Sequence, residues 1–87
     1  MLKIFTIYDL TAQRAGPLFT MESMTEAERY FHDGLKNAQE GSLWKSHPQD
    51  FVLYYLGEYD PKKLSISDIC STQVTVGKPL PSTAVSA

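Results

Sequence analysis

The chain alternates between runs of β-branched and aromatic residues and stretches rich in polar residues. Such apolar runs are typical of β-strands, and the two longest cover residues 2–8 and 51–59. A shorter apolar segment at residues 18–21 predicts a second strand or an extended lead-in. Residues 64–67 predict the antiparallel partner of a hairpin, and residues 73–76 predict a last edge strand.

One helix is predicted between the second and third strands. Ser23 with Glu26, and Thr25 with Glu28, fit a capping box, in which a hydroxyl and a carboxylate satisfy backbone amides at the helix start. Behind them the apolar positions recur at steps of three and four, which gives one apolar stripe: Ala27, Tyr30, Phe31, Gly34, Leu35 and Ala38. The helix should end before Gly41, because glycine commonly follows a helix C-terminus.

This order of elements predicts an α+β domain. We expect a small antiparallel sheet of three to four strands with one helix packed on one face. The domain should span residues 1–78, and residues 79–87, rich in Pro, Ser, Thr and Ala, should form a flexible C-terminal tail. Both long strands carry large apolar side chains on both faces, whereas one helix covers only one face of a sheet.

The second face of the sheet therefore needs a cover, and three alternatives stay open. The chain's own loop around Leu43 and Trp44 covers it, or it is buried against another copy of the chain, or its tyrosines stack on unpaired bases. We favour the second alternative and expect a homodimer formed through the sheet or its edge. A chain of 87 residues buries too little surface to be very stable alone.

Composition limits the class of function. With 8 Lys and Arg against 10 Asp and Glu, the formal net charge is −2, which excludes a simple polycationic coat for nucleic acid. The length excludes a large multidomain enzyme. No apolar run approaches the about 18 residues that span a bilayer, so we expect a soluble protein without a membrane partner. The single cysteine, Cys70, forms no internal disulfide and implies no oxidising compartment.

The sequence contains no recognisable motif for catalysis, metals or cofactors. The five glycines are scattered and form no phosphate-binding loop. His32, His47 and Cys70 lack the spacing of metal ligands, and no Ser or Cys has a base and an orienting group in a local signature. We therefore expect no enzyme activity, no cofactor and no metal.

Aromatic and basic residues together indicate a candidate nucleic-acid-binding surface. Lysines contact phosphates and aromatic rings stack on unpaired bases, so we predict six binding residues: Trp44, Lys45, Tyr54, Tyr55, Lys62 and Lys63. Structural alternatives stay open for two parts of this set. The Lys62-Lys63 doublet also fits a solvated turn that guards a strand edge, and Trp44 also fits a core residue beneath the long loop.

Several segments in a fixed order resemble a known viral family. They are residues 2–9, 17–19, the helix with Ala27 and Phe31, and residues 46–54, 56–60 and 76–78. The most specific are the His-Pro-x-Asp-Phe entry into the third strand at residues 47–51 and the Gly-Glu-Tyr-Asp at residues 57–60. Over about residues 1–78 the chain resembles the small nonstructural protein of gokushoviruses, single-stranded DNA phages of the Microviridae.

The resemblance implies a non-enzymatic phage protein that binds single-stranded DNA in genome replication or in the switch to packaging. It implies the cytoplasm of the infected bacterial host and supplies no catalytic residue. The alternative is a protein–protein adaptor that docks on the phage replication or assembly machinery or on a host factor. The expected partners are a second copy of the chain, single-stranded phage DNA, and phage replication or assembly proteins.

Overall fold

The computed structural model describes residues 1–77, which form an α+β fold with one antiparallel sheet and one main helix. The strands are β1 (Leu2–Asp9), β2 (Arg14–Ala15), β3 (Phe19–Met21), β4 (Phe51–Asp60), β5 (Ser65–Ser67) and β6 (Thr72–Val76). The helices are α1 (Met24–Lys36), the four-residue α2 (Leu43–Ser46) and the 3-10 turn η1 (Pro48–Asp50). The α+β class is confirmed, and six strands replace the expected three to four. The predicted domain end at residue 78 and tail at 79–87 lie outside the described residues.

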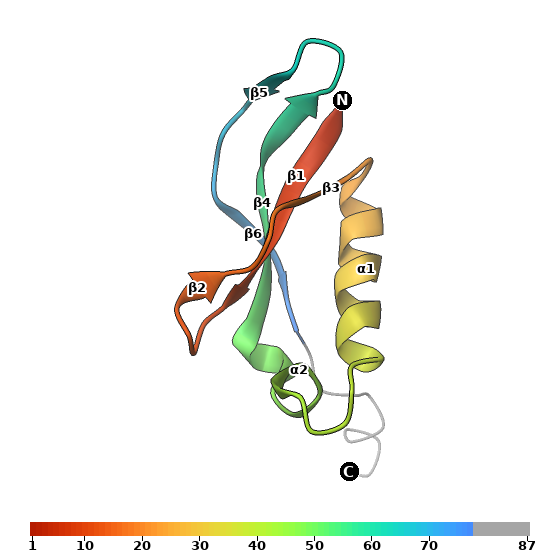
Figure 1. Ribbon diagram of the computed structural model, residues 1–87, viewed down its shortest axis with the longest axis vertical. Helices are drawn as coiled ribbons and strands as arrows, with labels where there is room; N and C mark the ends of the chain where they lie inside the picture. Colours follow the sequence, from red (N-terminus) through yellow and green to blue (C-terminus); the bar gives the residue numbers. More distant parts are fainter. Residues whose placement is uncertain (78–87) are drawn as a thin grey trace.

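Strands β1 and β4 form the centre of the sheet and pair antiparallel from Leu2↔Tyr59 to Asp9↔Phe51. Two short strands share the outer side of β1, with β2 beside its end and β3 beside its beginning. In the same way β5 and β6 share the outer side of β4. The six strands of the described part therefore occupy four positions across an elongated sheet (Figure 1).

Strand β2 lies in the polar stretch between the first two predicted strands, where no strand was predicted. The Asp9 side chain forms the turn before it, where Oδ1 accepts hydrogen bonds from the backbone N–H groups of Thr11 (2.9 Å) and Ala12 (3.1 Å). This turn brings Arg14 opposite Asp9. Turn chemistry rather than an apolar run creates the two-residue strand, so the hydrophobic pattern did not mark it.

Helix α1 begins where the capping motif predicts. Ser23 is its N-cap, and its hydroxyl accepts a hydrogen bond from the Glu26 N–H at 3.1 Å. The helix ends at Lys36, before Gly41 as predicted, so Ala38 of the predicted stripe lies beyond its end. A second capping serine, Ser42, starts the separate helix α2 within the segment predicted as a loop.

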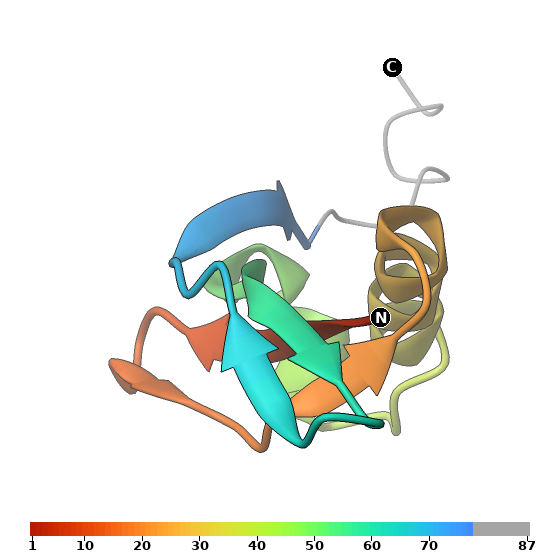
Figure 2. The same cartoon turned by 90° about the horizontal axis from the view of Figure 1, so that it is seen from above.

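The core lies between α1 and one face of the sheet, and α1 stands to one side of the strands (Figure 2). The buried cluster comprises Phe5, Ala27, Phe31, Leu35, Phe51 and Leu53. Three of these residues form the apolar stripe of α1, and the others come from β1 and β4. The prediction of one helix packed on one face is confirmed.

On the opposite face of the sheet, side chains of β1 and β4 pack against one another. Tyr8 pairs with Val52 and Thr6 pairs with Tyr54, so these four residues share this face. The two tyrosine rings are diagonal neighbours and meet edge to face with centroids 6.1 Å apart. Thr6 and Val52 between them are buried, and the Thr6 hydroxyl donates a hydrogen bond to the Gly16 carbonyl at 3.1 Å.

The loop around Leu43 and Trp44 does not cover this second face, so that alternative was wrong. The segment forms α2 on the helix side of the sheet, where the Trp44 ring lies 5.2 Å from that of Phe51. A side chain added at Gly34 of α1 would meet Trp44 at 3.5 Å. Trp44 is therefore packed between α1 and β4. This agrees with the alternative interpretation of Trp44 as a core residue.

Candidate binding groove

An open groove of about 560 Å³ lies on the helix side of the sheet, beside the edge formed by β2 and β3. Each of four elements contributes one aromatic ring to it: Phe19 from β3, Tyr30 from α1, Trp44 from α2 and Phe51 from β4. The other lining residues are Ile7, Asp9, Arg14, Ala15, Gly16, Pro17 and Leu18. A volume of this size is within the range of about 300–1,000 Å³ that is usual for small-molecule sites.

The four rings form two packed pairs. Phe19 and Tyr30 have centroids 5.1 Å apart at an angle of 54°, and Trp44 and Phe51 have centroids 5.2 Å apart at 38°. Tyr30 remains 54% exposed although it belongs to the predicted apolar stripe. The pairs hold the rings in place while leaving aromatic surface open to the groove, which suits a flat or apolar ligand group.

One cation and one anion lie at the margin of the groove. Arg14 of β2 and Asp9 of β1 are cross-strand partners, and both line the groove. Asp9 already accepts two backbone hydrogen bonds through Oδ1, whereas Arg14 is exposed. A ligand with a flat group in the groove and an anionic group outside it would find Arg14 beside the opening.

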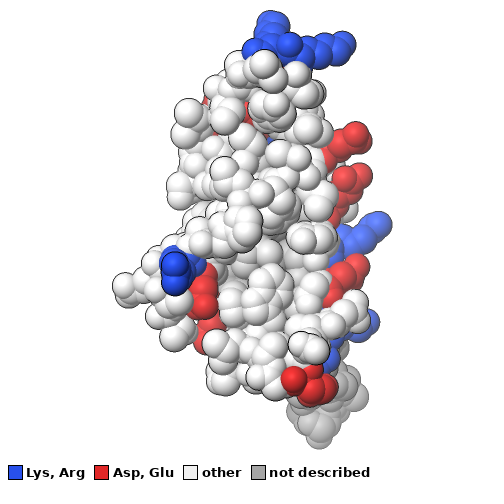
Figure 3. All heavy atoms as spheres, in the orientation of Figure 1, with Lys and Arg blue, Asp and Glu red and all other residues white. Residues whose placement is uncertain are grey.

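The structure places the predicted binding residues at several separate sites. Trp44 lines the groove, but the neighbouring Lys45 donates a hydrogen bond from Nζ to the Lys36 carbonyl at 2.8 Å. Lys62 and Lys63 are exposed in the turn between β4 and β5. Figure 3 shows basic side chains gathered at this tip of the hairpin, separated from the groove end of the molecule by a broad uncharged surface.

Tyr54 and Tyr55 lie on opposite faces of β4. Tyr54 contacts the ring of Tyr8 on the far face, whereas Tyr55 lies on the helix face with its ring centroid 5.7 Å from that of Phe5. The six predicted residues therefore do not form one surface within a single chain.

The groove includes several residues that the sequence analysis did not propose for binding. Phe19, Tyr30, Phe51 and Arg14 come from four different elements. No local spacing connects them, and each has an ordinary role in its own strand or helix. Only the tertiary fold brings them to Trp44.

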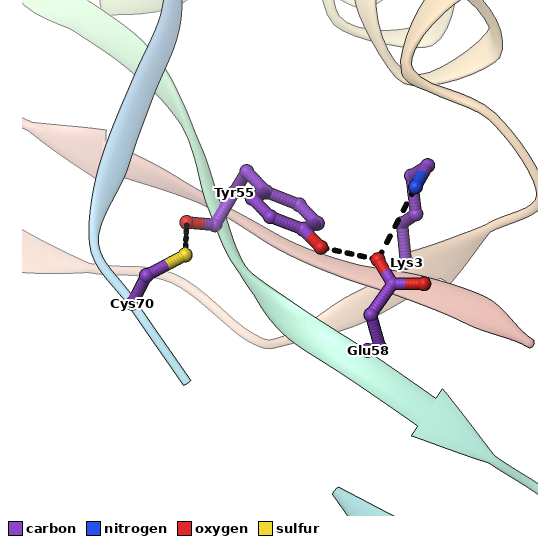
Figure 4. A network of polar contacts seen from close by, with 4 residues as sticks. All are labelled: Lys3, Tyr55, Glu58 and Cys70. Atoms are coloured by element: carbon purple, nitrogen blue, oxygen red, sulfur yellow. Dashed lines mark hydrogen bonds and ion pairs between the residues drawn. The ribbon is translucent and has the colours of Figure 1, made fainter. Parts of the chain in front are cut away.

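Tyr55 belongs to a polar network on the helix face (Figure 4). Its hydroxyl donates a hydrogen bond to Glu58 Oε2, and Lys3 Nζ lies 3.2 Å from the same oxygen. The hydrogen bond to Glu58, assisted by burial, raises the pKa of Tyr55 to about 12. The same bond, with a smaller effect from Lys3, lowers the pKa of the Glu58 carboxyl. The Cys70 thiol also contacts the Tyr55 carbonyl at 3.5 Å.

Within residues 1–77, no three His, Cys, Asp or Glu side chains are grouped so that they could hold a metal ion. In that same part of the chain, none of the helices has the length and apolar character needed to cross a membrane.

Fold and groove together define a small α+β protein with one main helix on an antiparallel sheet and an aromatic groove at the sheet edge. The family model described as Phage ORF5 protein matches residues 2–78. The chain therefore belongs to this family of phage proteins, in agreement with the phage origin that the resemblance implied. No curated protein and no solved structure matches the chain.

Proposed function

We propose that this phage protein binds single-stranded DNA without catalysis, in the cytoplasm of the infected bacterial host, and acts in genome replication or in the switch to packaging. The observation that carries the proposal is the aromatic groove with Arg14 at its margin. Proteins that bind single strands commonly combine stacking aromatic rings with nearby cations. Membership of a phage family is consistent with such a partner.

In this proposal an unpaired base enters the groove and stacks against Tyr30 or Trp44. Stacking of one base on an aromatic side chain contributes about 1–3 kcal/mol, and it tolerates any base because each has a π-face. Arg14 contacts a flanking phosphate, which positions the strand without reading its sequence. Lys62 and Lys63 are too far along the molecule to contact the same nucleotide, so a longer strand is needed to reach them.

The net charge of −2 predicts a small electrostatic contribution. For single strands, the logarithm of affinity falls with the logarithm of salt concentration with a slope of about −0.7 per phosphate contact. We expect a slope that corresponds to one or two contacts, because Arg14 is the one basic residue that lines the groove within residues 1–77. Stacking rather than charge should therefore provide most of the affinity.

Trp44 offers a direct test because it is the only tryptophan in the chain. We expect its fluorescence to be quenched when an oligothymidine is titrated into the protein at low salt. Tyr30→Ala should weaken this binding, while Tyr54→Ala, on the other face of the sheet, serves as the matched control. Absence of any binding at low salt, where phosphate contacts are strongest, would exclude the proposed function. Loss of binding in Tyr54→Ala but not in Tyr30→Ala would instead indicate that DNA binds the far face of the sheet.

The second candidate is a protein–protein adaptor, and the edge beside the groove favours it. Among the described residues β3 pairs only with β1, so its outer side is open, and the neighbouring Leu18 is 65% exposed. A partner strand added to this edge would place one of its side chains in the groove. Recovery of a phage replication or capsid protein after nuclease treatment, and its loss with Leu18→Asp, would support the adaptor against DNA binding.

A further inference from the structure

We propose that Asp9 makes the groove selective for guanine among the bases of single-stranded DNA. The proposal rests on DNA binding in the groove, as proposed for this protein, and adds the base that the groove prefers. Stacking on Tyr30 or Trp44 discriminates little between bases, because every base has a π-face. Selectivity therefore needs a polar group in the groove that meets the edge of the stacked base.

The register of the sheet places Asp9 beside the aromatic rings. Asp9 pairs with Arg14 of β2 on one side and with Phe51 of β4 on the other, so the three side chains form one row across the helix face. Trp44 packs on Phe51 with ring centroids 5.2 Å apart, and all four residues line the groove. A base that stacks in the groove therefore presents its edge to a carboxylate.

One oxygen of the Asp9 carboxylate is held by the turn, and the other is available. Oδ1 accepts hydrogen bonds from the backbone N–H groups of Thr11 at 2.9 Å and Ala12 at 3.1 Å, which orients the half-buried side chain. Within residues 1–77, Oδ2 has no hydrogen-bond partner, and Asp9 forms no ion pair with Arg14. The groove thus contains an oriented acceptor that this part of the chain does not use.

Guanine matches such an acceptor better than the other bases do. A carboxylate accepts hydrogen bonds and donates none, and guanine carries two adjacent donors, N1–H and the N2 amino group, on one edge. Adenine and cytosine each offer one amino group beside an acceptor nitrogen, and thymine offers one N–H between two carbonyl oxygens. Hydrogen bonds to an ionised acceptor are about twice as strong as neutral ones. The expected order of affinity therefore begins with guanine and ends with thymine.

Arg14 is the competing candidate for recognition of the base, because an arginine fork pairs with O6 and N7 of guanine. Arg14 is exposed and belongs to a strand of two residues. Asp9, by contrast, is already oriented by two hydrogen bonds, and a group held in place before binding loses less conformational entropy on binding. Arg14 therefore keeps the phosphate contact of the proposed function, and Asp9 meets the base.

The first experiment compares pentanucleotides that differ in one base. Each has four thymidines around a central guanine, adenine, cytosine or thymine, and dissociation constants are measured at low salt from the fluorescence of Trp44. We expect central guanine to bind about tenfold more tightly than central thymine, with the other two between them. Equal affinities would overturn the selectivity and leave the proposed function standing, whereas no binding of any pentanucleotide would overturn both.

Asp9→Asn separates the available oxygen from the turn. The new amide oxygen still accepts the hydrogen bonds of Thr11 and Ala12, whereas an N–H₂ group replaces Oδ2, so the preference for guanine over thymine should disappear. Asp50→Asn is the matched control, because this half-buried carboxylate is outside the groove lining and its Oδ2 already accepts a hydrogen bond from the Thr11 hydroxyl at 3.2 Å. The control should retain the preference. A preference that survives Asp9→Asn would overturn the assignment.

Base analogues test the same contact in the unaltered protein. Hypoxanthine lacks the N2 amino group of guanine, so a pentanucleotide with central inosine should bind several-fold more weakly than one with guanine. 7-Deazaguanine keeps N1–H and the amino group but lacks N7, which an Arg14 fork would contact, and it should bind as guanine does. Full affinity for the inosine pentanucleotide, or a loss confined to 7-deazaguanine, would contradict recognition by Asp9.

Discussion

The Tyr55 hydroxyl donates a hydrogen bond to the Glu58 carboxylate, although the two residues are three positions apart in one strand. In a regular strand such residues lie on opposite faces. Here the β1–β4 ladder skips Leu56, which forms a bulge and returns Glu58 to the helix face. Lys3 on the neighbouring strand then reaches the same carboxylate at 3.2 Å. A single extra residue thus creates the polar network on this face.

Removal of the Tyr55 hydroxyl should raise the pKa of Glu58. In Tyr55→Phe the carboxylate loses the hydrogen bond that contributes most to its lowered pKa and keeps the contact with Lys3 and the attraction of the N-terminal amine. A carboxyl titration followed by NMR measures the change. Tyr54→Phe on the opposite face is the control and should leave the Glu58 titration as in the wild type.

The same network makes stability depend on acid pH. Because folding lowers the pKa of Glu58, its contribution is fully present above the ordinary glutamate pKa of about 4.3 and is lost as the pH falls through the folded value. The free energy of unfolding of the wild type should therefore fall in this range more steeply than that of Glu58→Gln. Parallel curves for the two proteins in urea unfolding at acid pH would refute this linkage.

At alkaline pH, the direction in which stability changes with pH is determined by Tyr55. Its pKa is raised to about 12, so the neutral phenol is favoured in the folded protein. The corresponding stability is present below the ordinary tyrosine pKa of about 10 and is lost as the pH rises through about 12. Phenolate absorbance should show a component that titrates near pH 12, and this component should vanish in Tyr55→Phe.

Gly57 should tolerate substitution less well than Gly41. Gly57 has φ of +148°, and a Cβ there would lie 2.9 Å from the carbonyl oxygen of Ser67, the last residue of β5, and 3.4 Å from that of Asp68. Gly41 has φ of +87° with nothing within 4 Å of such a Cβ, so Gly41→Ala measures the backbone conformation alone. We expect that variant to lose about 1 kcal/mol and Gly57→Ala to lose more in chemical denaturation. Equal losses would show that the end of β5 and the residues after it move aside freely.

Phe31 should be the most costly position of α1. Its side chain is fully buried between α1 and the sheet, and Phe31→Ala should lower the free energy of unfolding by about 3–5 kcal/mol. The adjacent Tyr30 is 54% exposed at the groove, and Tyr30→Ala should lose only about 1 kcal/mol. Urea unfolding of both variants gives the comparison. It also checks that Tyr30→Ala is folded before it is used in DNA titrations.

Features that depend on neighbouring residues could be predicted from the sequence. The Ser23 cap and the stripe of α1 were predicted because hydrogen bonds and side chains within a helix connect residues three and four apart. The long strands β1 and β4 were predicted from continuous apolar runs. Strand β2 was missed because its formation depends on the side chain of Asp9 in a turn.

The candidate site was harder to predict for a related reason. Trp44 was singled out, but its partners in the groove come from β2, β3, α1 and β4, and no spacing along the chain relates them. Lys45, Lys62 and Lys63 were grouped by charge, yet they lie at different places on the molecule.

The sequence by itself determined the α+β class, the place of the helix and an apolar content too large for one helix to cover, because each follows from local periodicity. The tertiary structure alone decided how the second face is used. Cross-strand pairing set Tyr8 against Tyr54, and the bulge at Leu56 turned Glu58 towards Tyr55. It also left Ile66 at an open edge. Pairing register depends on contacts between distant segments, and hydrophobic periodicity within one segment does not specify it.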